Sequence, residues 1–234
     1  MIAWLDADTP FPPLDAALAE PNGLLAAGGD LSPQRLVAAY RRGIYPWYSD
    51  GQPVLWWSPD PRMVLPVEEF RQSRSLSRRI KRHEFVISVD TAFDQVIDAC
   101  ASAPRDAQRG TWITQEMIAA YQDMHTLHYA HSVEAWRDNE LVGGLYGLAL
   151  GRVFFGESMF TRVSDASKVC LATLVVLLQQ RGVALIDCQQ ETGHLASMGA
   201  RPISRSDFAR ALRELIHSDA APAGWTPGPI PEHG

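Results

Sequence analysis

Residues 153–190 decide the fold; they read VFFGESMFTRVSDASKVCLATLVVLLQQRGVALIDCQQ. The two ends are short apolar runs typical of buried strands, and the middle has the length and composition of a helix. Polar residues interrupt both runs, namely Glu157 and Ser158 in the first and Asp187 and Gln189 in the second. Residues two apart on a strand share a face, so we expect Asp187 and Gln189 to point the same way. Polar groups in a buried strand are costly unless partnered, so this pair is either a satisfied network or a site.

The remaining segments extend this strand-helix-strand unit into a mixed sheet. From residue 84 onward the pattern predicts strand, helix, helix, three strands, helix, strand and helix. This order gives an α+β fold with a mainly antiparallel meander followed by a β-α-β unit. Residues 44–62 are instead dense in aromatics, prolines and turn residues, which is typical of a compact subdomain or a recognition loop. The prolines at 59 and 61 predict a boundary, giving a small N-terminal domain (1–61) and a larger domain (62–234).

Capping signals locate three of the helices. Ser32 followed by Pro33 predicts a helix start, and Thr114 predicts another start, for a helix that runs to about residue 127. Ser206 is expected to cap the last helix, which ends near Ile216. The tail after Ser218 is rich in proline and glycine, and we expect it to be loosely held.

Composition excludes several classes of protein. The net charge of -6 argues against a general nucleic-acid binder, yet residues 71–83 carry six cations and no acid. The three cysteines have no metal or disulfide spacing, which favours a reducing compartment. No signal peptide and no membrane-length apolar run is evident, so a cytoplasmic location is expected. Three histidines between 125 and 131 bridge a helix end and a strand start, and we do not expect them to bind a metal.

Four stretches carry a resemblance to a known family: EPNGLLAAGGDLSP (20–33), RGIYPWYSDGQPVLWWSPDPR (42–62), GTWIT (110–114), and GESMF with LIDCQ (156–160 and 185–189). Together they resemble bacterial leucyl/phenylalanyl-tRNA–protein transferases over about residues 20–216. The resemblance implies a small N-terminal domain packed on a GNAT-like acyltransferase domain. It also implies transfer of leucine or phenylalanine from aminoacyl-tRNA to proteins with N-terminal arginine or lysine, which marks them for degradation. No metal, cofactor or membrane is implied, and we expect a monomer.

The resemblance also implies roles for particular residues. Asp187 and Gln189 match the proposed catalytic pair. An amide is a poor base, so we interpret Gln189 as orienting the amine, with Asp187 holding it, polarising it or helping to take the proton. A tRNA ribose hydroxyl is the rival proton shuttle. The residues expected to form the aminoacyl pocket and the 3′-adenosine platform are Tyr40, Trp47, Trp112, Leu145, Phe154, Gly156, Glu157, Ser158 and Met159. The residues expected to contact the tRNA backbone are Arg74, Arg78, Arg79, Lys81 and Arg82.

Structural roles remain open for all of these residues. The Asp187–Gln189 pair could serve solely to tie two strands together, which is a purely structural alternative. In the same way, the tryptophans are alternatively a contact between the two domains, and the pocket residues are alternatively ordinary core side chains. Glu157, expected to pair with a substrate cation or amino group, could instead form an ion pair with an arginine. The basic run could be an ordinary solvated helix face.

Two other functions also remain open. One is a coenzyme-A-dependent N-acetyltransferase, but residues 162–168 lack the glycines that cradle a pyrophosphate and carry Asp165 there. The other is a non-catalytic adaptor that binds tRNA or peptide.

Overall fold

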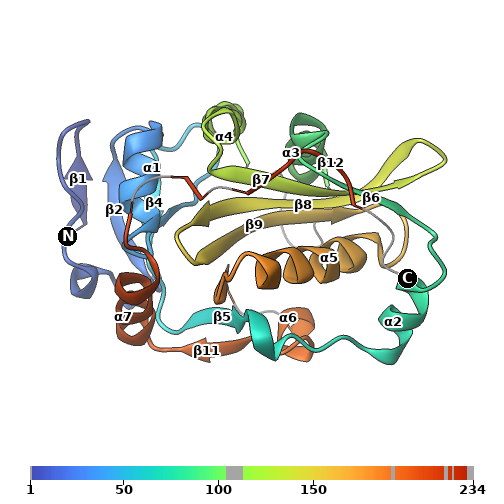
Figure 1. Ribbon diagram of the computed structural model, residues 1–234. Helices are drawn as coiled ribbons and strands as arrows, with labels where there is room; N and C mark the ends of the chain where they lie inside the picture. Colours follow the sequence, from blue (N-terminus) through green and yellow to red (C-terminus); the bar gives the residue numbers. More distant parts are fainter. Residues whose placement is uncertain (1, 104–112, 191–192, 219–220, 223, 231–234) are drawn as a thin grey trace.

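The computed structural model describes residues 2–103, 113–190, 193–218, 221–222 and 224–230. In this part of the chain the strands form two sheets, one small and one large, beside one another (Figure 1). The small sheet has the order β1 (Ala3–Leu5), β2 (Leu24–Gly28), β4 (Leu55–Trp57) and β3 (Tyr45–Pro46). The β1 and β2 strands run parallel, and the other neighbours are antiparallel.

The large sheet contains the stretch that was expected to organise the fold. Its order is β11 (Arg201–Ile203), β5 (Arg62–Pro66), β10 (Leu185–Gln189), β9 (Val153–Thr161), β8 (Glu140–Leu150), β7 (Ala130–Arg137), β6 (Val86–Val89) and β12 (Gly228–Pro229). In the described part of this large sheet only β9 and β10 pair in parallel, and the crossover helix α5 (Ala166–Gln180) joins them. The α+β class with mixed sheets is therefore confirmed.

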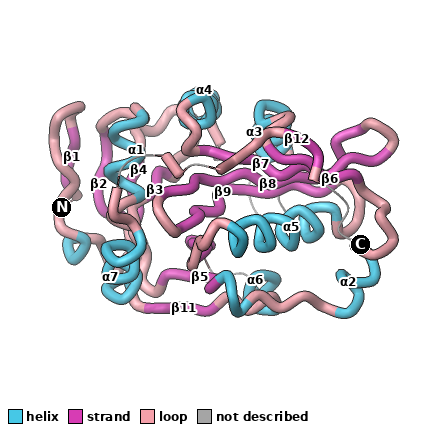
Figure 2. Tube along the Cα trace, in the orientation of Figure 1, coloured by secondary structure: helices cyan, strands magenta, loops and turns pink. Residues whose placement is uncertain are grey.

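Helices cover both faces of the large sheet (Figure 2). α5 lies on one face, and α3 (Phe93–Ser102) and α4 (Gln115–Thr126) lie on the other. The close approach of α5 depends on a glycine, because a Cβ at Gly143 would stand 2.5 Å from the Cβ of Ala166. The remaining helices are α1 (Pro33–Tyr40), α2 (Arg74–Ile80), α6 (Gly193–Ser197) and α7 (Arg205–Leu215), with short 3-10 turns η1 (Leu14–Ala16) and η2 (Val67–Glu69). No helix in the described ranges is both long and apolar enough to cross a bilayer.

The two faces of the large sheet contribute to separate core clusters. Alternate residues on β9 point to opposite faces, so Phe154 packs with α5 and Phe155 packs with α3, α4 and the small sheet. The cluster that contains Phe155 also contains Trp56 from the small sheet and Tyr40 from α1. The predicted boundary at residues 61 and 62 falls between the strands of the two sheets, and it remains a prediction for independent domains.

Two local expectations were wrong. Ser204, not Ser206, caps α7: its hydroxyl accepts from the backbone N–H of Asp207 at 3.0 Å. The tail is also held, because β12 pairs with β6 and the Trp225 ring stacks on His131 with centroids 3.9 Å apart. The high proline and glycine content of the tail predicted a loose segment, and it gave no sign that Trp225 would hold the tail against His131.

Candidate active site

The candidate site lies where β9 and β10 separate. Their parallel pairing ends at Phe155 and Asp187, and each strand then carries one extra residue relative to its antiparallel neighbour. Glu157 is the extra residue on β9, and Cys188 is the extra residue on β10. Such bulges redirect side chains and open a strand pair, and they are common beside active sites.

A cavity of about 410 Å³ opens between the separated strands and α5. Its lining is mainly apolar, with polar groups from the two bulged segments. The lining residues are Leu65, Leu145, Tyr146, Phe154, Gly156, Glu157, Ser158, Met159, Leu171, Leu174, Ile186, Asp187, Cys188, Gln189 and Leu195. All six residues that were expected to form the aminoacyl pocket on β8 and β9, and both members of the expected catalytic pair, are therefore brought together around one space.

Glu157 has three side-chain hydrogen-bond partners at this cavity. Its Oε1 lies 2.7 Å from the hydroxyl of Tyr40 and 3.0 Å from the amide nitrogen of Gln189, and its Oε2 lies 3.0 Å from the hydroxyl of Tyr121. The partners come from α1, β10 and α4, so three distant parts of the chain converge on one carboxyl group. The ion pair with an arginine that was weighed from the sequence is not the arrangement found at Glu157.

Burial dominates the electrostatics of this cluster. It raises the pKa of Glu157 to about 7, against hydrogen bonds from Tyr40 and Tyr121 that act to lower it. Burial also raises the pKa values of both tyrosines well above the usual value, and the nearby carboxyl group of Glu157 adds to this. Near neutral pH the site can therefore gain or lose a proton at Glu157, while both phenols stay neutral.

Asp187 is fully buried and paired with an arginine. Its two carboxylate oxygens accept from Nε and Nη2 of Arg62 at 2.8 and 2.6 Å. The remaining Nη1 of Arg62 donates to the carbonyl of Gly43 at 3.0 Å, and the guanidinium lies between the rings of Tyr45 and Phe208. The orientation of Asp187 is thus fixed by Arg62 of the large sheet, which is itself held by Tyr45 of the small sheet.

Gln189 is linked to Asp187 through its backbone. Its N–H donates to Oδ1 of Asp187 at 2.9 Å, while its side-chain amide donates to Glu157. Gln189 has a φ of +60°, in the left-handed region that non-glycine residues rarely adopt. The prediction that the side chains of Asp187 and Gln189 share a face assumed a regular strand. The bulge between these two residues breaks that regular alternation. Asp187 therefore positions Gln189 through its main chain.

The expected adenosine platform is only partly described. Tyr40 is 1% exposed, so its hydroxyl, rather than an open ring face, is what reaches the site. Trp47 is half-buried on the small sheet, with its ring edge-on to Trp57 at 5.5 Å, and it is not among the described residues lining the cavity. Trp112 lies outside the described residues.

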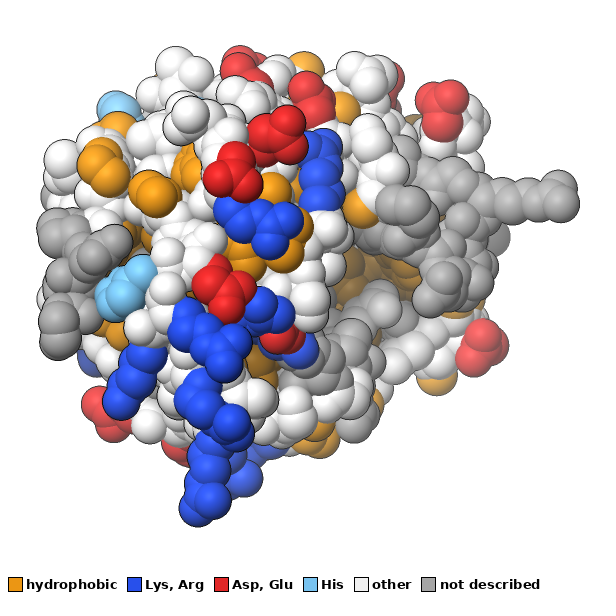
Figure 3. Space-filling model, turned by 90° about the vertical axis from the view of Figure 1, so that its right-hand side faces the viewer, with side chains coloured by type: hydrophobic (Ala, Val, Ile, Leu, Met, Phe, Trp, Pro, Cys, Tyr) orange, Lys and Arg blue, Asp and Glu red, His pale blue; other side chains and the backbone are white. Residues whose placement is uncertain are grey.

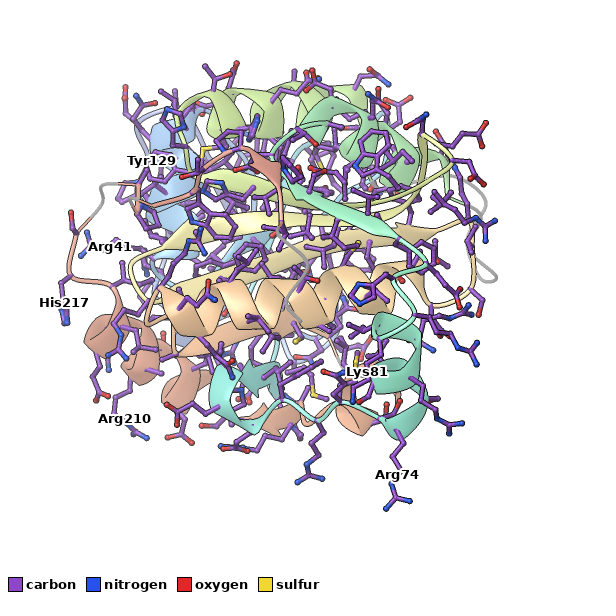
Figure 4. All side chains as sticks on the ribbon, turned by 45° about the vertical axis from the view of Figure 1, so that its right-hand side comes forward. Arg41, Arg74, Lys81, Tyr129, Arg210 and His217 are labelled. Atoms are coloured by element: carbon purple, nitrogen blue, oxygen red, sulfur yellow. The ribbon has the colours of Figure 1, made fainter. Side chains whose placement is uncertain are left out.

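The expected tRNA-contacting residues lie on and just after α2. Arg74, Arg78, Lys81 and Arg82 are exposed, and Arg74 extends away from the fold (Figure 4). Lysine and arginine side chains gather on this part of the surface (Figure 3). Arg82 pairs with Glu84 at 3.6 Å. Arg79 differs in being half-buried between two acids, with Glu84 at 2.5 Å and Asp165 at 3.5 Å.

The histidines have local structural partners. His131 bonds Asp90 at 2.8 Å and stacks on Trp225, whereas His125 stacks on Phe93 and bonds the backbone of Ala130. No group of three metal-ligating residues occurs in the described ranges.

Two residues of the site escaped sequence reasoning. Tyr121 lies on the buried face of α4, and a hydroxyl on an otherwise apolar helix face was the available signal. Arg62 is the first residue of β5. A cation at the start of an apolar strand indicates a buried acidic partner, but the sequence does not identify that partner.

Comparisons with known proteins agree on one family. The family model described as leucyl/phenylalanyl-tRNA protein transferase matches residues 64–213, and the model of its N-terminal domain matches residues 29–60. The leucyl/phenylalanyl-tRNA–protein transferase of Pseudomonas entomophila is 61% identical, covering 96% of this chain and 99% of the relative. The protein of the same name from Azoarcus sp. is 58% identical, covering 97% and 96%.

Likeness to solved structures is much weaker. A GCN5-related N-acetyltransferase-like protein from Streptococcus suis aligns with 12% identity and a TM-score of 0.36, covering 73% of this chain and 64% of that one. A likeness of this size supports no conclusion about function.

Proposed function

The chain belongs to the leucyl/phenylalanyl-tRNA protein transferase family, and from this premise we propose that it moves leucine or phenylalanine from aminoacyl-tRNA to the α-amino group of acceptor proteins. The observation that carries the proposal is the apolar cavity at the strand separation, with Glu157 and Gln189 at its polar edge. An apolar cavity of about 410 Å³ accommodates either side chain. It discriminates between related apolar groups by only about 1–3 kcal/mol, which suits an enzyme that accepts both.

The reaction places modest demands on the protein. An amine attacks an ester and forms an amide, which is downhill, so the main tasks are to position two substrates and to stabilise the oxyanion. An α-amino group has a pKa near ~8, so part of it is already neutral at pH 7. Gln189 orients the attacking amine, and Asp187, fixed by Arg62, holds the backbone of Gln189 in place.

The proposed tRNA contacts combine stacking and charge. Trp47 stacks on the 3′ adenosine, an interaction worth about 1–3 kcal/mol for each base. The same role for Trp112, which lies outside the described residues, rests on the family resemblance. The exposed cations of α2 and the residues that follow it contact the tRNA backbone without reading its sequence. The acceptors carry N-terminal arginine or lysine, and the transfer marks them for degradation in the cytoplasm; both statements rest on the family resemblance.

One assay tests the proposal directly. The protein is incubated with tRNA charged with labelled leucine and a peptide beginning with arginine, and label in the peptide is measured. The matched control is the same peptide with its α-amino group acetylated. We expect label in the free peptide only, with a lysine-initiated peptide behaving alike and an alanine-initiated one poorly labelled. Absence of label in every peptide would contradict the proposed activity, and equal labelling of all free peptides would contradict the acceptor preference.

The two alternative functions give different results. The start of α5 holds the carboxylate of Asp165, bonded to Lys168 at 2.7 Å, where an acetyltransferase needs open amides for pyrophosphate. We therefore expect no binding of acetyl-coenzyme A by calorimetry. An adaptor would bind charged tRNA or peptide and transfer nothing.

A further inference from the structure

Four oxygen atoms at the cavity edge form a closed ring. The hydroxyls of Tyr40 and Tyr121 lie 2.5 Å apart. Each hydroxyl also lies within hydrogen-bond distance of one oxygen of Glu157, at 2.7 Å for Tyr40 and 3.0 Å for Tyr121. All three side chains are buried, with Tyr121 and Tyr40 at 0 and 1% exposed and Glu157 at 7%.

The ring requires one more proton than the two phenols supply. Each of its three oxygen–oxygen contacts needs a proton between the atoms, and a tyrosine hydroxyl carries only one. If Glu157 were ionised and both hydroxyls donated to it, two oxygens would face one another at 2.5 Å without a proton. In a buried site of low dielectric, that arrangement is strongly unfavourable.

A protonated Glu157 satisfies every contact. Its Oε2–H donates to Tyr121, Tyr121 donates to Tyr40, and Tyr40 donates to Oε1. Oε1 then acts as the carbonyl oxygen and also accepts the amide N–H of Gln189 at 3.0 Å. Each tyrosine hydroxyl then donates one hydrogen bond and accepts one, and Oε1 accepts two.

We propose that Glu157 is protonated in the resting enzyme and that its proton, held in the ring with Tyr40 and Tyr121, is given to the ribose oxygen when the aminoacyl ester breaks. The catalytic half of this inference rests on the proposed function. Glu157 lines the cavity and would contact the reacting atoms, so it is a catalytic residue. Tyr40 and Tyr121 act through it and are positioning residues.

The step balances without outside reagents. The amine nitrogen forms a bond to the ester carbonyl carbon, and the bond from that carbon to the ribose oxygen breaks. The leaving oxygen takes the proton of Glu157, and the resulting carboxylate takes the proton that the amine nitrogen must lose. Glu157 ends protonated again, and no proton is exchanged with solvent.

The surroundings of Glu157 support the neutral form near neutral pH. Burial raises the pKa of Glu157 to about 7, and the charge of Asp187 on β10 adds to the increase. The charge of Arg62 on β5 acts in the opposite direction, as do the hydroxyls of Tyr40 on α1 and Tyr121 on α4 when they donate to an ionised Glu157.

Infrared spectroscopy tests the first half without any substrate. The carboxylic-acid C=O band is recorded for the wild type and for Glu157→Gln at pH 6, and the difference is taken. We expect one buried acid band in the wild type that is missing in the variant and that disappears from the wild type as the pH rises to 9. If the wild type shows no such band at pH 6 and none titrates, the proposal is overturned. The wild-type titration remains informative even if the variant does not fold.

Single-turnover kinetics tests the second half. We expect Glu157→Gln to lower the transfer rate constant by about 10²- to 10⁴-fold, the usual range for loss of a general acid, while the binding of charged tRNA is unchanged. Tyr121→Phe removes the hydroxyl that accepts the proton of Glu157, so the protonated acid loses stabilisation and the descending limb of the pH–rate profile should move to lower pH. Tyr129→Phe, which removes a hydroxyl outside the ring, is the matched control (Figure 4).

The outcomes separate the two proposals. An acid band with a wild-type rate in Glu157→Gln overturns the catalytic role of the proton. A wild type that transfers no label refutes the proposed function, and the infrared result then decides alone whether the ring holds its proton.

Discussion

Arg62 and Asp187 form a buried ion pair next to the candidate site. Both side chains are at most 1% exposed, and Arg62 is also bonded to the backbone of Gly43 and enclosed by aromatic rings. Both carboxylate oxygens of Asp187 already accept hydrogen bonds from Arg62. The contribution of Asp187 is to hold the backbone N–H of Gln189, and with it the amide that meets Glu157.

Removing one member of this pair should therefore damage stability as well as activity. We expect Arg62→Met to lower the free energy of unfolding by about 3–5 kcal/mol, because an unpaired carboxylate remains buried. The double variant Arg62→Met with Asp187→Leu should regain much of that stability in urea unfolding, yet still fail to transfer label, because Gln189 has lost its anchor. Regained activity in the double variant would show that the anchor is dispensable. An undiminished stability of Arg62→Met would contradict the energetic argument.

Glu157 should make the stability of the protein depend on pH in an unusual direction. Its pKa rises on folding from 4.5 to about 7, so between these values the folded state holds a proton that the unfolded state has lost. Stability therefore falls as the pH rises through this window, by about 1 kcal/mol for each unit. Between pH 6 and 8 we expect the wild type to lose about 1 kcal/mol more than Glu157→Gln in urea unfolding. Glu140→Gln, which removes an exposed glutamate, is the control; identical pH dependence in all three proteins would refute the shift.

At the scale of elements, the cations on and just after α2 differ in whether an acidic side chain pairs with them. Arg79 is occupied by Glu84 and Asp165, whereas Arg74, Arg78 and Lys81 are exposed. Arg82 is exposed too, but it lies 3.6 Å from Glu84. Arg74, Arg78 and Lys81 form no ion pair with the described residues and are suited to phosphates.

Charge reversal on α2 should therefore weaken tRNA binding in a salt-dependent way. For Arg74→Glu and Arg78→Glu we expect the slope of log K against log salt to become shallower by about one for each lost phosphate contact. The control is Arg210→Glu, the same change on α7, well away from α2 in Figure 4. An equal loss of affinity with the control would indicate a general charge effect, and an unchanged slope would count against a phosphate contact.

The sequence predicted elements well where one strong local signal decided them. The unit from β9 through α5 to β10 follows from apolar runs and length, and the caps Ser32 and Thr114 follow from side-chain chemistry. Ser204 was missed because Ser206 is an equally good cap by residue type, and only tertiary packing chooses between them. Sequence periodicity also cannot reveal that each of two strands carries an extra residue, although those bulges shape the site.

Long-range partners were the least predictable part of the site. The cavity residues of β8, β9 and β10 could be predicted because they lie on or beside the organising stretch and match the family motifs. The contacts of Tyr121 with Glu157 and of Arg62 with Asp187 join residues 36 and 125 positions apart, and no local pattern specifies such pairings. The anchoring of the tail by Trp225 on His131 is a third example.

At the scale of the whole molecule, the small sheet and the large sheet share both a core and a site. One hydrophobic cluster contains Trp56 and Tyr40 from the N-terminal part together with Phe155 from β9. Tyr40 closes the proton ring on Glu157, and the carbonyl of Gly43 completes the bonding of Arg62. The predicted division at residues 61 and 62 therefore separates partners that satisfy one another's buried groups.

A fragment comprising residues 62–234 should consequently fail to fold alone. Without the N-terminal part, apolar side chains of the shared cluster are exposed, and the carboxyl of Glu157 and the guanidinium of Arg62 each lose a hydrogen-bond partner, at about 1–3 kcal/mol for each group left unsatisfied. We expect the isolated fragment to show no cooperative unfolding by circular dichroism, whereas the full chain unfolds in one transition. Co-expression of residues 1–61 as a separate chain is the matched control and should restore a cooperative transition. A fragment that unfolds cooperatively alone would show that the large sheet forms an independent domain, and that the N-terminal part serves the site without being needed for the fold.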